Sequence, residues 1–453
     1  MERKFVELYP SLGLLTLGAY LRAHDAEVRL VDLTFERDAG SVTRTLRSFR
    51  PHLVGVHTKT LTAPRALAVA RLARSAGSVT VAGGPDAATR PGLYLDGGFD
   101  VVVPGEGEPT VVDLARRARD GGSLLGVPGT IVRGAGGPIR GPSRPLIRDL
   151  DTLPLPAWDL VDMERYLTSW QRATGQRRAA VLTSRGCPFD CSWCSKPTFG
   201  RSFRQQSPRR VLAELRALRD RYQVDYVRFC DDVFGIHRAW LEELLRRMAE
   251  ENLGLKFECL ARVDLLKPDL LGSMRAAGLE RVYVGVESGS QKMLDLMNRG
   301  TKLRQVERTA EALRKAGVRQ FWFLMLGYPG ETEEDIEATF QLFRRFSPEE
   351  YSVSIAVPIP GTRLHDQVRD RLTGGFRSTR RSGGDSLLFE GAYPERFYRW
   401  EQRRFRLEAA LGRARERLSP KVVDGIGRTA DRFHRRVAAP LLAGPRRRAP
   451  PTR

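Results

Sequence analysis

Short apolar runs alternate with amphipathic segments along the chain from residue 12 to about residue 122. In the amphipathic segments apolar residues recur at helical spacing, which predicts helices, and proline or glycine ends most of them. The apolar runs between them have the length of buried strands. Strands that alternate with helices favour a Rossmann-type, doubly wound parallel sheet, whose ligand site lies beyond the carboxyl ends of the strands. We expect helices at 12–24, 42–51, 63–77 and 108–122, and strands at 26–33, 52–58, 78–84 and 99–105.

A second alternating series begins at residue 179 and runs to residue 358. Its apolar runs and amphipathic segments predict a partial parallel (β/α)6 barrel, a fold that carries its chemistry at the C-terminal ends of the strands. The expected strands are 179–184, 224–232, 255–264, 281–288, 319–327 and 350–358, and the expected helices are 207–222, 238–252, 267–278, 306–317 and 333–346.

The segments that flank the second series have a different composition. Residues 122–178 are rich in glycine, proline and arginine, which predicts a short hairpin followed by an extended linker. Beyond about residue 376, a basic amphipathic helix at 394–418 precedes a basic tail that we expect to be disordered. The helix can pack against the barrel or lie on an acidic partner or membrane surface, and packing is the simpler expectation. The predicted parts are a first domain at 1–140, a linker at 141–178, a barrel at 179–375 and a helical extension at 376–453.

Composition indicates where the protein is located but does not identify its substrate. No uncharged apolar run approaches the roughly 18 residues that a membrane-spanning helix needs, and the N-terminus lacks the apolar core of a signal peptide, so we expect a cytoplasmic protein. The formal net charge is +21, from 75 Lys and Arg against 54 Asp and Glu. An Arg-rich composition spread over the surface explains this charge. An acidic small-molecule substrate (a nucleotide sugar, a phosphate ester or a carrier-bound acid), a nucleic acid or an anionic membrane explains it as well.

Three of the five cysteines, Cys187, Cys191 and Cys194, lie within eight residues, directly after the first predicted barrel strand. This clustering suits a metal or redox site better than a disulfide framework. A structural zinc site needs a fourth ligand, but Cys230 and Cys259 lie on separate predicted strands, where we expect buried packing residues. A ferredoxin would also supply a fourth nearby cysteine. The three thiolates therefore suit a four-iron, four-sulfur cluster with one iron open to a non-protein ligand.

The sequence CPFDCSWC at 187–194 resembles the CxxxCxφC loop of the radical S-adenosylmethionine (SAM) enzymes, with Trp193 at the aromatic position beside the cluster. The resemblance implies that the amino and carboxylate groups of SAM fill the open iron site. An electron, supplied by a donor such as flavodoxin or ferredoxin, then cleaves SAM to a 5′-deoxyadenosyl radical. The further SAM contacts that it implies at the ends of the later strands are Asp231 and Asp232 (ammonium), Arg262 (carboxylate), Glu287 and Ser288 (ribose and methionine), and Gly327 and Gly330 (backbone beside adenine).

The first domain resembles the cobalamin-binding domain that precedes the barrel in a large radical SAM subclass. Glycines after its strands allow the backbone to approach a bulky ligand, although tight strand-to-helix turns favour glycine as well. No GxGxxG fingerprint supports a dinucleotide. The residues implied as cobalamin contacts are His57, Thr58, Lys59, Gly83, Gly84, Gly105, Glu106, Gly107 and Glu108.

Two features depart from the pattern of cobalamin proteins. The DxHxxG element is absent: if Gly13 takes its last place, Pro10 stands where the axial histidine would be. We therefore expect cobalamin to be bound without an imidazole from that loop, and His57 and Lys59 become candidates for its lower face. Residues 3–9 also offer only a short first strand, which indicates either a truncated sheet or a misplaced start codon.

Together these features favour a cobalamin-dependent radical SAM C-methyltransferase that acts on an unactivated carbon of an antibiotic, other secondary-metabolite or lipid precursor. The alternative is a radical SAM dehydratase, cyclase or rearrangement enzyme whose cobalamin domain is vestigial or non-methylating. A transfer-RNA methylthiotransferase would carry three further N-terminal cysteines, whereas none precedes Cys187 here. A non-enzymatic iron–sulfur protein would leave the barrel motifs without a use.

Overall fold

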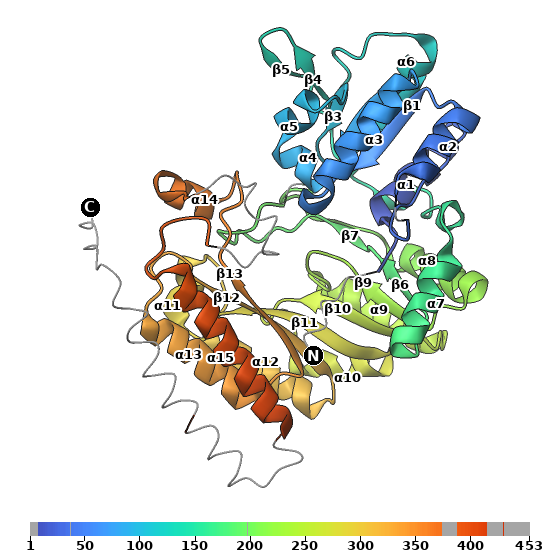
Figure 1. Ribbon diagram of the computed structural model, residues 1–453. Coiled ribbons are helices and arrows are strands. Elements are labelled where there is room, and N and C mark those ends of the chain that lie inside the picture. The colour runs from blue at the N-terminus through green and yellow to red at the C-terminus, as the bar shows by residue number, and fades with distance from the viewer. Residues whose placement is uncertain (1–7, 37, 197, 374–386, 415–428, 430–453) are drawn as a thin grey trace. The chain divides into compact units, whose positions relative to one another are not determined.

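The computed structural model describes residues 8–36, 38–196, 198–373, 387–414 and 429, which form two compact units (Figure 1). The first unit holds the N-terminal sheet and the early barrel strands, and the second holds the later barrel strands and the C-terminal helix. In residue numbers, the first unit comprises the described parts of 1–188, 196–260 and 276–278, and the second those of 189–195, 261–275 and 279–453.

The N-terminal sheet has the strand order β1-β2-β3-β4-β5. Its first three strands are parallel, as predicted, and the register places Gly83 beside both His57 and Val103. The last two strands form the predicted hairpin, in which β4 pairs antiparallel to β3 and β5 pairs antiparallel to β4. The parallel strands therefore end side by side, which is where ligands bind in open α/β sheets. The strands are β1 (Leu53–His57), β2 (Val79–Gly83), β3 (Val101–Val103), β4 (Ile131–Gly134) and β5 (Gly137–Arg140).

Helices pack on this sheet through small residues. Ala66 and Ala70 of α3 are buried with Tyr94, Phe99 and Val102 in one core cluster. Alanine on the helix lets its backbone approach the strands closely, so the larger aromatic side chains can fill the space that remains. The helices of this region are α1 (Leu12–Arg22), α2 (Gly40–Phe49), α3 (Ala63–Ser75), α4 (Pro85–Thr89), α5 (Pro91–Asp96) and α6 (Glu108–Asp120).

Of two strands predicted for the N-terminal region, one is wrong and the other stays a prediction. The strand predicted at 26–33 is wrong, because these residues form no strand. Their apolar side chains are used in another way: Val31 and Leu33 pack, partly buried, against Val42 and Leu46 of α2. The short first strand expected at 3–9 lies mostly outside the described residues.

The predicted linker at 141–178 is not extended throughout. Residues Met163–Thr174 form α7. Asp162 caps this helix, because its side chain accepts a hydrogen bond from the Arg165 amide. Tyr166 and Trp170 of this helix are buried, and the helix packs on β6. The spacing of these apolar residues is helical and would have predicted this helix. The sequence interpretation missed it because the flanking residues are rich in glycine and proline.

All six predicted barrel strands are present, alternating with helices. In the first unit β6, β9 and β10 are parallel neighbours, with Phe229 of β9 opposite both Val181 and Cys259. Ser207 caps α8 by accepting a hydrogen bond from the Arg210 amide, with proline at the first helical position. The elements are β6 (Arg178–Val181), α8 (Pro208–Tyr222), β9 (Tyr226–Phe229), α9 (Arg238–Glu250) and β10 (Lys256–Ala261), with a short β7 (Ser184–Arg185) paired to β8 (Arg204–Gln205).

In the second unit β11, β12 and β13 are parallel neighbours, and a β-bulge at Gly285 and Glu287 interrupts the register of β11 with β12. The bulge lies at the C-terminal end of its strand, where the barrel fold carries its chemistry. The elements are α10 (Pro268–Ala276), β11 (Leu279–Glu287), α11 (Gln291–Leu296), α12 (Leu303–Lys315), β12 (Arg319–Leu326), α13 (Glu333–Phe346), β13 (Glu350–Ile355) and α14 (Arg363–Val368).

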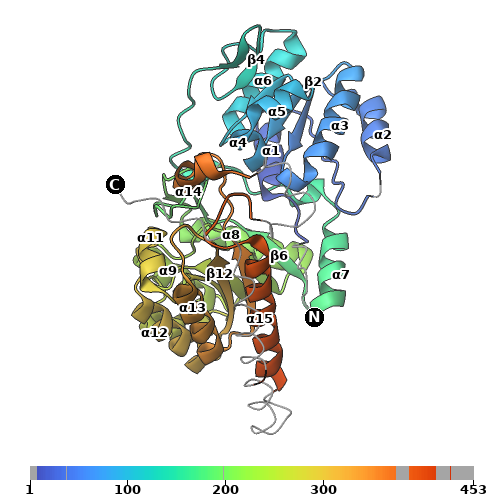
Figure 2. The same cartoon turned by 60° about the vertical axis from the view of Figure 1, so that its left-hand side comes forward.

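The C-terminal basic helix, α15 (Glu395–Ala414), packs on α13 and β13 within the second unit, as Figures 1 and 2 both show. Phe405 lies at an edge-to-face angle to Phe340 and Phe343, and Gln402 Nε2 donates to the Val353 carbonyl at 2.8 Å. The expectation that this helix packs against the barrel is therefore confirmed for the described residues. The predicted disordered tail lies outside them.

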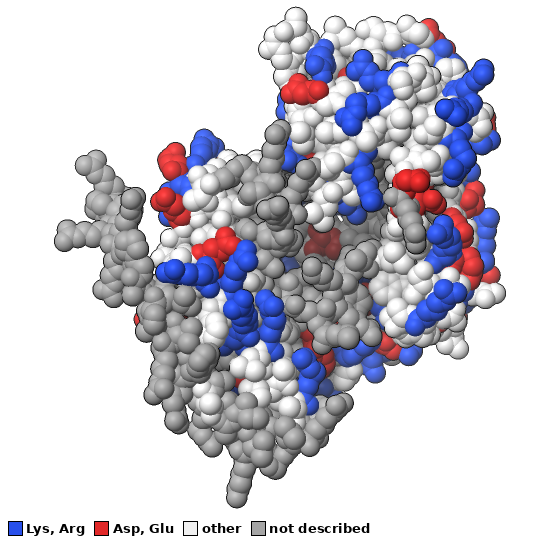
Figure 3. All heavy atoms as spheres, in the orientation of Figure 1, with Lys and Arg blue, Asp and Glu red and all other residues white. Residues whose placement is uncertain are grey.

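Basic side chains occur in several separate groups on the face in Figure 3, with acidic groups between some of them. Many of the arginines form ion pairs within the chain, for example Arg177 with Glu164 and Arg216 with Glu251. This distribution supports a general Arg-rich surface as one source of the +21 charge. None of the described helices has both the length and the apolar character needed to cross a bilayer.

Candidate active site

The cysteine loop begins on the β7–β8 ribbon. Gly186 has a positive φ of 82°, and a Cβ at this position would lie 2.2 Å from the Ser202 carbonyl oxygen, so the turn requires glycine. The next residue, Cys187, donates its amide to the Gly200 carbonyl at 3.2 Å and is buried. The first cysteine is therefore held by backbone geometry.

Cys191 lies among positive charges in the second unit. Its Sγ accepts a hydrogen bond from Arg299 Nη1 at 3.3 Å, and Arg262 Nη1 lies 3.9 Å away. Cys191 is buried, as are both arginines. The Arg262 guanidinium also stacks over the Phe189 ring, with its central carbon 3.7 Å from the ring centroid. The Cys191 sulfur therefore lies beside two positively charged groups.

Trp193 and Cys194 complete the motif. Trp193 is half-buried and packs against the core cluster that includes Met293, Met297 and Tyr328. A backbone hydrogen bond also holds this part of the cysteine loop, since the Ser192 amide donates to the Met297 carbonyl at 3.0 Å. Cys194 itself is exposed.

Glu287, at the end of β11, has a strained backbone. Its φ of +64° is in the left-handed region, which costs a residue other than glycine on the order of 1–3 kcal/mol. Burial raises the pKa of its carboxyl, and the nearby Arg299 and Arg262 oppose that rise. Arg299 Nη2 lies 3.8 Å from Glu287 Oε1. Gly285 makes room for this pair, because a Cβ there would lie 2.3 Å from Arg299 Nη2.

Ser288 follows the strained residue and is fully buried. Its hydroxyl shares a hydrogen bond of 2.9 Å with Thr339 of α13 and accepts the Ser290 amide at 3.1 Å. The structure thus uses Ser288 to join the end of β11 to α13, and its contact with SAM remains a prediction.

The loop after β12 depends on a buried carboxylate. Gly327 and Gly330 both have positive φ angles, of 77° and 88°. The Gly327 amide donates to Glu331 Oε2 at 2.6 Å, while Glu331 Oε1 has no partner among the described residues. Burial raises the pKa of Glu331 to about 8, and Asp335 and Glu401 add to the rise. Glu331 therefore holds the backbone that was predicted to approach adenine.

The two acids after β9 differ in their environment. Asp231 is buried, and its Oδ1 accepts from the amide and hydroxyl of Thr183 at 3.0 Å each and from the Ser184 hydroxyl. Its Oδ2 has no partner within the described part of the chain, and burial raises its pKa to about 6. Asp232 is exposed. The prediction that Cys230 is buried is wrong, because β9 ends before it and its side chain is exposed, whereas Cys259 within β10 is buried as expected.

The residues predicted to contact cobalamin lie at the ends of β1 and β2. His57 Nδ1 lies 3.4 Å from the Ser11 hydroxyl, and burial, with a contribution from Lys59, lowers the pKa of His57 to about 4. The imidazole is therefore neutral at pH 7. Gly84 has a φ of +100°, and a Cβ there would lie 2.6 Å from the His57 ring, so glycine is required beside the histidine. Lys59 is exposed.

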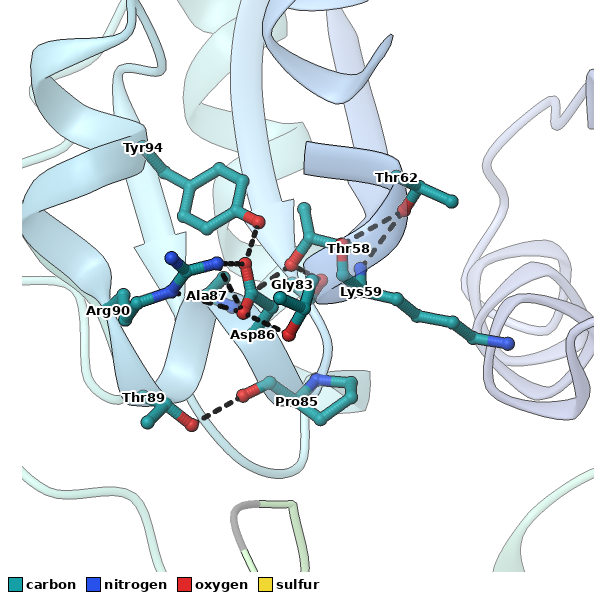
Figure 4. Close-up of polar contacts among 11 residues, drawn as sticks. Thr58, Lys59, Thr62, Gly83, Pro85, Asp86, Ala87, Thr89, Arg90 and Tyr94 are labelled. Atoms are coloured by element: carbon teal, nitrogen blue, oxygen red, sulfur yellow. Dashed lines mark hydrogen bonds and ion pairs between the residues drawn. The ribbon is translucent and has the colours of Figure 1, made fainter. Parts of the chain in front are cut away.

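A buried carboxylate, Asp86, organises the turn after β2 (Figure 4). Its oxygens accept from Arg90 Nη2 at 2.7 Å, from the Thr60 hydroxyl at 2.8 Å and from the Tyr94 hydroxyl. Close by, Thr58 donates to the Gly83 carbonyl at 2.9 Å, while its hydroxyl accepts the Ala87 amide. We call Thr60, Asp86, Arg90 and Tyr94 the Asp86 centre.

Glu106 and Glu108, after β3, bind arginines of the ribbon that leads into the cysteine loop. Glu106 Oε1 accepts from Arg185 Nη1 at 3.1 Å and from Arg204 Nη1 at 2.6 Å, and Glu108 forms an ion pair with Arg185. All four side chains are at least nine-tenths buried. Gly105 has a φ of +81°, and Gly107 precedes the first turn of α6. The carboxylates are therefore used within the chain, and their contact with cobalamin remains a prediction.

Comparison with known proteins decides the family. Residues 181–343 match the radical SAM superfamily, and residues 3–115 match the B12 binding domain. An uncharacterized methyltransferase of Pyrococcus horikoshii, PH0819, is 31% identical over 361 residues, which cover 78% of this chain and 77% of the relative. This chain belongs to the radical SAM enzymes with a B12-binding domain.

Other members of this family differ in their named reactions. The anaerobic magnesium-protoporphyrin IX monomethyl ester cyclase of Rubrivivax gelatinosus is 28% identical, over 80% of this chain and 67% of the relative. The radical SAM methyltransferase TsrM of Kitasatospora setae, solved with cobalamin and a [4Fe-4S] cluster, superposes with a TM-score of 0.68. That match covers 80% of this chain and 72% of TsrM at 21% sequence identity, and it shows a shared fold.

The cofactors of this family are a 4Fe-4S cluster, SAM and cobalamin, and the donor chemistry of the chain fits them. Cys191 is a buried cysteine beside two guanidinium groups, whose positive charge would complement an iron-bound thiolate. Asp231 and Glu331 each leave a buried carboxyl oxygen unpartnered within the described residues. Among the described residues, no three His, Cys, Asp or Glu side chains are arranged so that they could hold a metal ion. Cys187 belongs to the first unit, whereas Cys191 and Cys194 belong to the second.

Several residues of the site were missed by the sequence interpretation. Arg299 donates a hydrogen bond to the Cys191 sulfur, and Glu331 holds the loop after β12. Glu331 lies in the glycine-containing loop directly after β12, so a search for charged residues next to that turn could have found it, whereas Arg299 lies beyond α11 and gave no such signal. Asp86 and Arg185 gave no sequence signal beyond their charge, because their role depends on partners distant in the sequence.

Proposed function

We propose that this chain is a cobalamin-dependent radical SAM C-methyltransferase that transfers a methyl group to an unactivated carbon of a secondary-metabolite or lipid precursor. The observation that carries the proposal is the pair of family matches in one chain, at 3–115 and 181–343, together with a methyltransferase relative that is 31% identical. These matches fall within the first domain (1–140) and the barrel (179–375) of the proposed organisation, with the linker at 141–178 and the extension at 376–453.

When bound, the cluster and SAM supply a radical that removes hydrogen from the substrate, and cobalamin supplies the methyl group. The chain holds the cluster through the thiolates of Cys187, Cys191 and Cys194. Arg299 and Arg262 place positive charge beside the Cys191 sulfur, and we assign Arg262 to the SAM carboxylate. The strained turn at Glu287 directs its carboxylate to the ribose, since strain of this kind persists where function requires the geometry.

Other strand ends complete the proposed SAM site. Asp231 and Asp232 bind the ammonium group, with the unpartnered Oδ2 of Asp231 as the acceptor that the chain leaves open. Glu331 fixes the Gly327 amide, and so shapes the backbone beside the adenine. The family's need for reduced thiols favours the cytoplasm, with flavodoxin or ferredoxin as the electron donor.

In the first domain, the strand ends at His57, Gly83 and Gly105 would hold cobalamin. His57 and Lys59 are the candidates to contact its lower face, and the lowered pKa of His57 would keep the imidazole neutral, so that it would add no charge there. The net charge of +21 favours an acidic small molecule as the substrate, for example a nucleotide sugar, a phosphate ester or a carrier-bound acid.

The relative named as a cyclase favours a second candidate, a radical SAM cyclase or rearrangement enzyme that transfers no methyl group. SAM with a deuterated methyl group separates the two. The anaerobically reconstituted full chain, with cobalamin, a reductant and candidate acidic substrates, is analysed by mass spectrometry. A C-methyltransferase forms S-adenosylhomocysteine and 5′-deoxyadenosine in equal amounts, and its product carries the deuterated methyl group. An unlabelled product with 5′-deoxyadenosine alone would establish the second candidate.

A further inference from the structure

Two guanidinium groups meet the sulfur of Cys191, but they are bonded differently. Arg262 donates to Asp264 from Nε at 2.9 Å and to the Arg299 carbonyl from Nη2 at 2.7 Å, which leaves a long contact of 3.9 Å to the sulfur. Arg299 makes the shorter sulfur contact, at 3.3 Å. Arg262 therefore supports Arg299, and Arg299 bonds the cysteine.

The chain fixes Arg299 from several sides. Its amide donates to the Leu294 carbonyl at 2.9 Å, and its Nη2 donates to the Gly285 carbonyl at 3.1 Å. The residue before it, Asn298, donates from Nδ2 to the Asp190 carbonyl of the cysteine loop at 2.7 Å. The Arg299 side chain is 9% exposed, so this cation has little water to screen it.

We propose that Arg299 is a positioning residue that sets the reduction potential of the cluster through its charged hydrogen bond to the Cys191 sulfur. The proposal rests on ligation of the cluster by Cys191 and does not depend on methyl transfer. Hydrogen bonds to cluster sulfurs and nearby charge are two of the factors that set the potential of an iron–sulfur cluster. Reduction adds one negative charge, so a buried cation bonded to a ligand sulfur stabilises the reduced form more than the oxidised form.

Glu287 limits the size of this effect. Its carboxyl lies 3.8 Å from Arg299 Nη2, so an ionised Glu287 offsets part of the charge of the guanidinium. The hydrogen bond to the sulfur is unaffected by that offset, because Nη1 makes it. A variant that displaces the guanidinium without changing any charge therefore separates the hydrogen bond from the net charge.

Gly285 provides that variant. A Cβ there would lie 2.3 Å from Arg299 Nη2 and 2.6 Å from Glu287 Oε1, so Gly285→Ala forces the two side chains to move. Arg299→Lys keeps a positive charge but loses the planar donor arrangement of the guanidinium. Arg304→Gln is the matched control, since Arg304 is an exposed arginine of α12 and its replacement removes one positive charge as well.

The test is a redox titration of the reconstituted full chain, without SAM or cobalamin, followed by the electron paramagnetic resonance (EPR) signal of the reduced cluster. We expect Arg299→Gln to lower the midpoint potential by about 59 mV, which is a tenfold change in the ratio of reduced to oxidised cluster for one electron. Arg299→Lys and Gly285→Ala should give smaller shifts of the same sign, and Arg304→Gln none.

Iron and sulfide are measured in every variant. If Arg299→Gln binds too little iron to titrate, Gly285→Ala and Arg299→Lys decide the question. Equal midpoint potentials in the wild type and in every titratable variant of Arg299 and Gly285 would overturn the proposal. The outcome is separate from that of the labelling experiment, because a cluster with a shifted potential is measured whether or not any substrate is methylated.

Discussion

The Asp86 centre of the N-terminal domain and the surroundings of Arg299 in the barrel are both buried charged clusters. They differ in how many of their polar atoms have hydrogen-bond partners. Asp86 accepts hydrogen bonds from a guanidinium and two hydroxyls, and both of its oxygens are used. Arg299 has one sulfur contact at 3.3 Å and a carboxylate at 3.8 Å, and its Nε has no partner among the described residues. The first cluster is a closed network that stabilises a turn, and the second retains capacity to bind.

The two regions also differ in backbone strain. The Asp86 centre lies at the start of α4, where only glycine has a positive φ. The Arg299 region includes Glu287, which has a φ of +64° at a β-bulge. Strain and unpaired buried groups carry a cost in the free energy of folding, so their coincidence indicates a site kept for a ligand.

The largest expected effect is the loss of the cluster when Cys191, the cysteine beside Arg299, is replaced. Cys191→Ala removes a thiolate that the account assigns to the cluster, so we expect loss of the cluster's absorption band and of nearly all bound iron after reconstitution. Cys259→Ala is the matched control, because Cys259 is a fully buried thiol of β10 that no part of the account assigns to iron. Equal iron contents in the two variants would contradict the assignment.

Glu331 offers a test of the unpaired carboxyl groups. Its pKa is about 8 in the folded chain and about 4.5 as an ordinary glutamate, so the folded state keeps a proton that the unfolded state loses. Its contribution to stability is complete below about pH 4.5 and is lost as the pH rises through about 8. We expect the unfolding free energy of the wild type, relative to Glu331→Gln, to fall by up to about 5 kcal/mol across that window. Urea unfolding of both proteins measures this, and parallel pH profiles would exclude the raised pKa.

Asp86→Ala tests the closed network. It leaves the Arg90 cation without its main partner, so we expect the free energy of unfolding of the N-terminal domain to fall by about 3 kcal/mol. Tyr94→Phe, which removes one hydrogen bond from the same carboxylate, should cost about 1 kcal/mol. Urea unfolding measures both, and iron content should remain that of the wild type. A large loss of iron in Asp86→Ala would show that the two regions are not independent.

Much of the fold follows from local pattern. The helical spacing of apolar residues and the short apolar runs predicted the parallel strands of the first sheet, the hairpin and all six barrel strands, because these segments bury one face or both. The strand predicted at 26–33 was wrong, since an apolar run can pack against a helix without pairing in a sheet. The helix at Met163–Thr174 was missed because glycine and proline around it dominated the interpretation.

The site was predictable only in part, for a physical reason. The cysteine spacing and the glycine-rich strand ends are contiguous in sequence, so they identified the loop and the turns. The contact of Arg299 with Cys191 joins residues 108 positions apart, and the bond of Arg185 to Glu108 joins residues 77 apart. Such pairs depend on the folded chain, and no local pattern distinguishes these arginines from the other basic residues of the sequence.

The central claim is that the cysteine loop holds an iron–sulfur cluster that binds and reductively cleaves SAM. The most direct measurement is the EPR spectrum of the reduced, reconstituted full chain before and after addition of SAM, with 5′-deoxyadenosine quantified in the same sample. The account predicts that SAM changes the spectrum of the cluster and that 5′-deoxyadenosine forms. An unchanged spectrum and no 5′-deoxyadenosine, from protein with a full complement of iron, would contradict it.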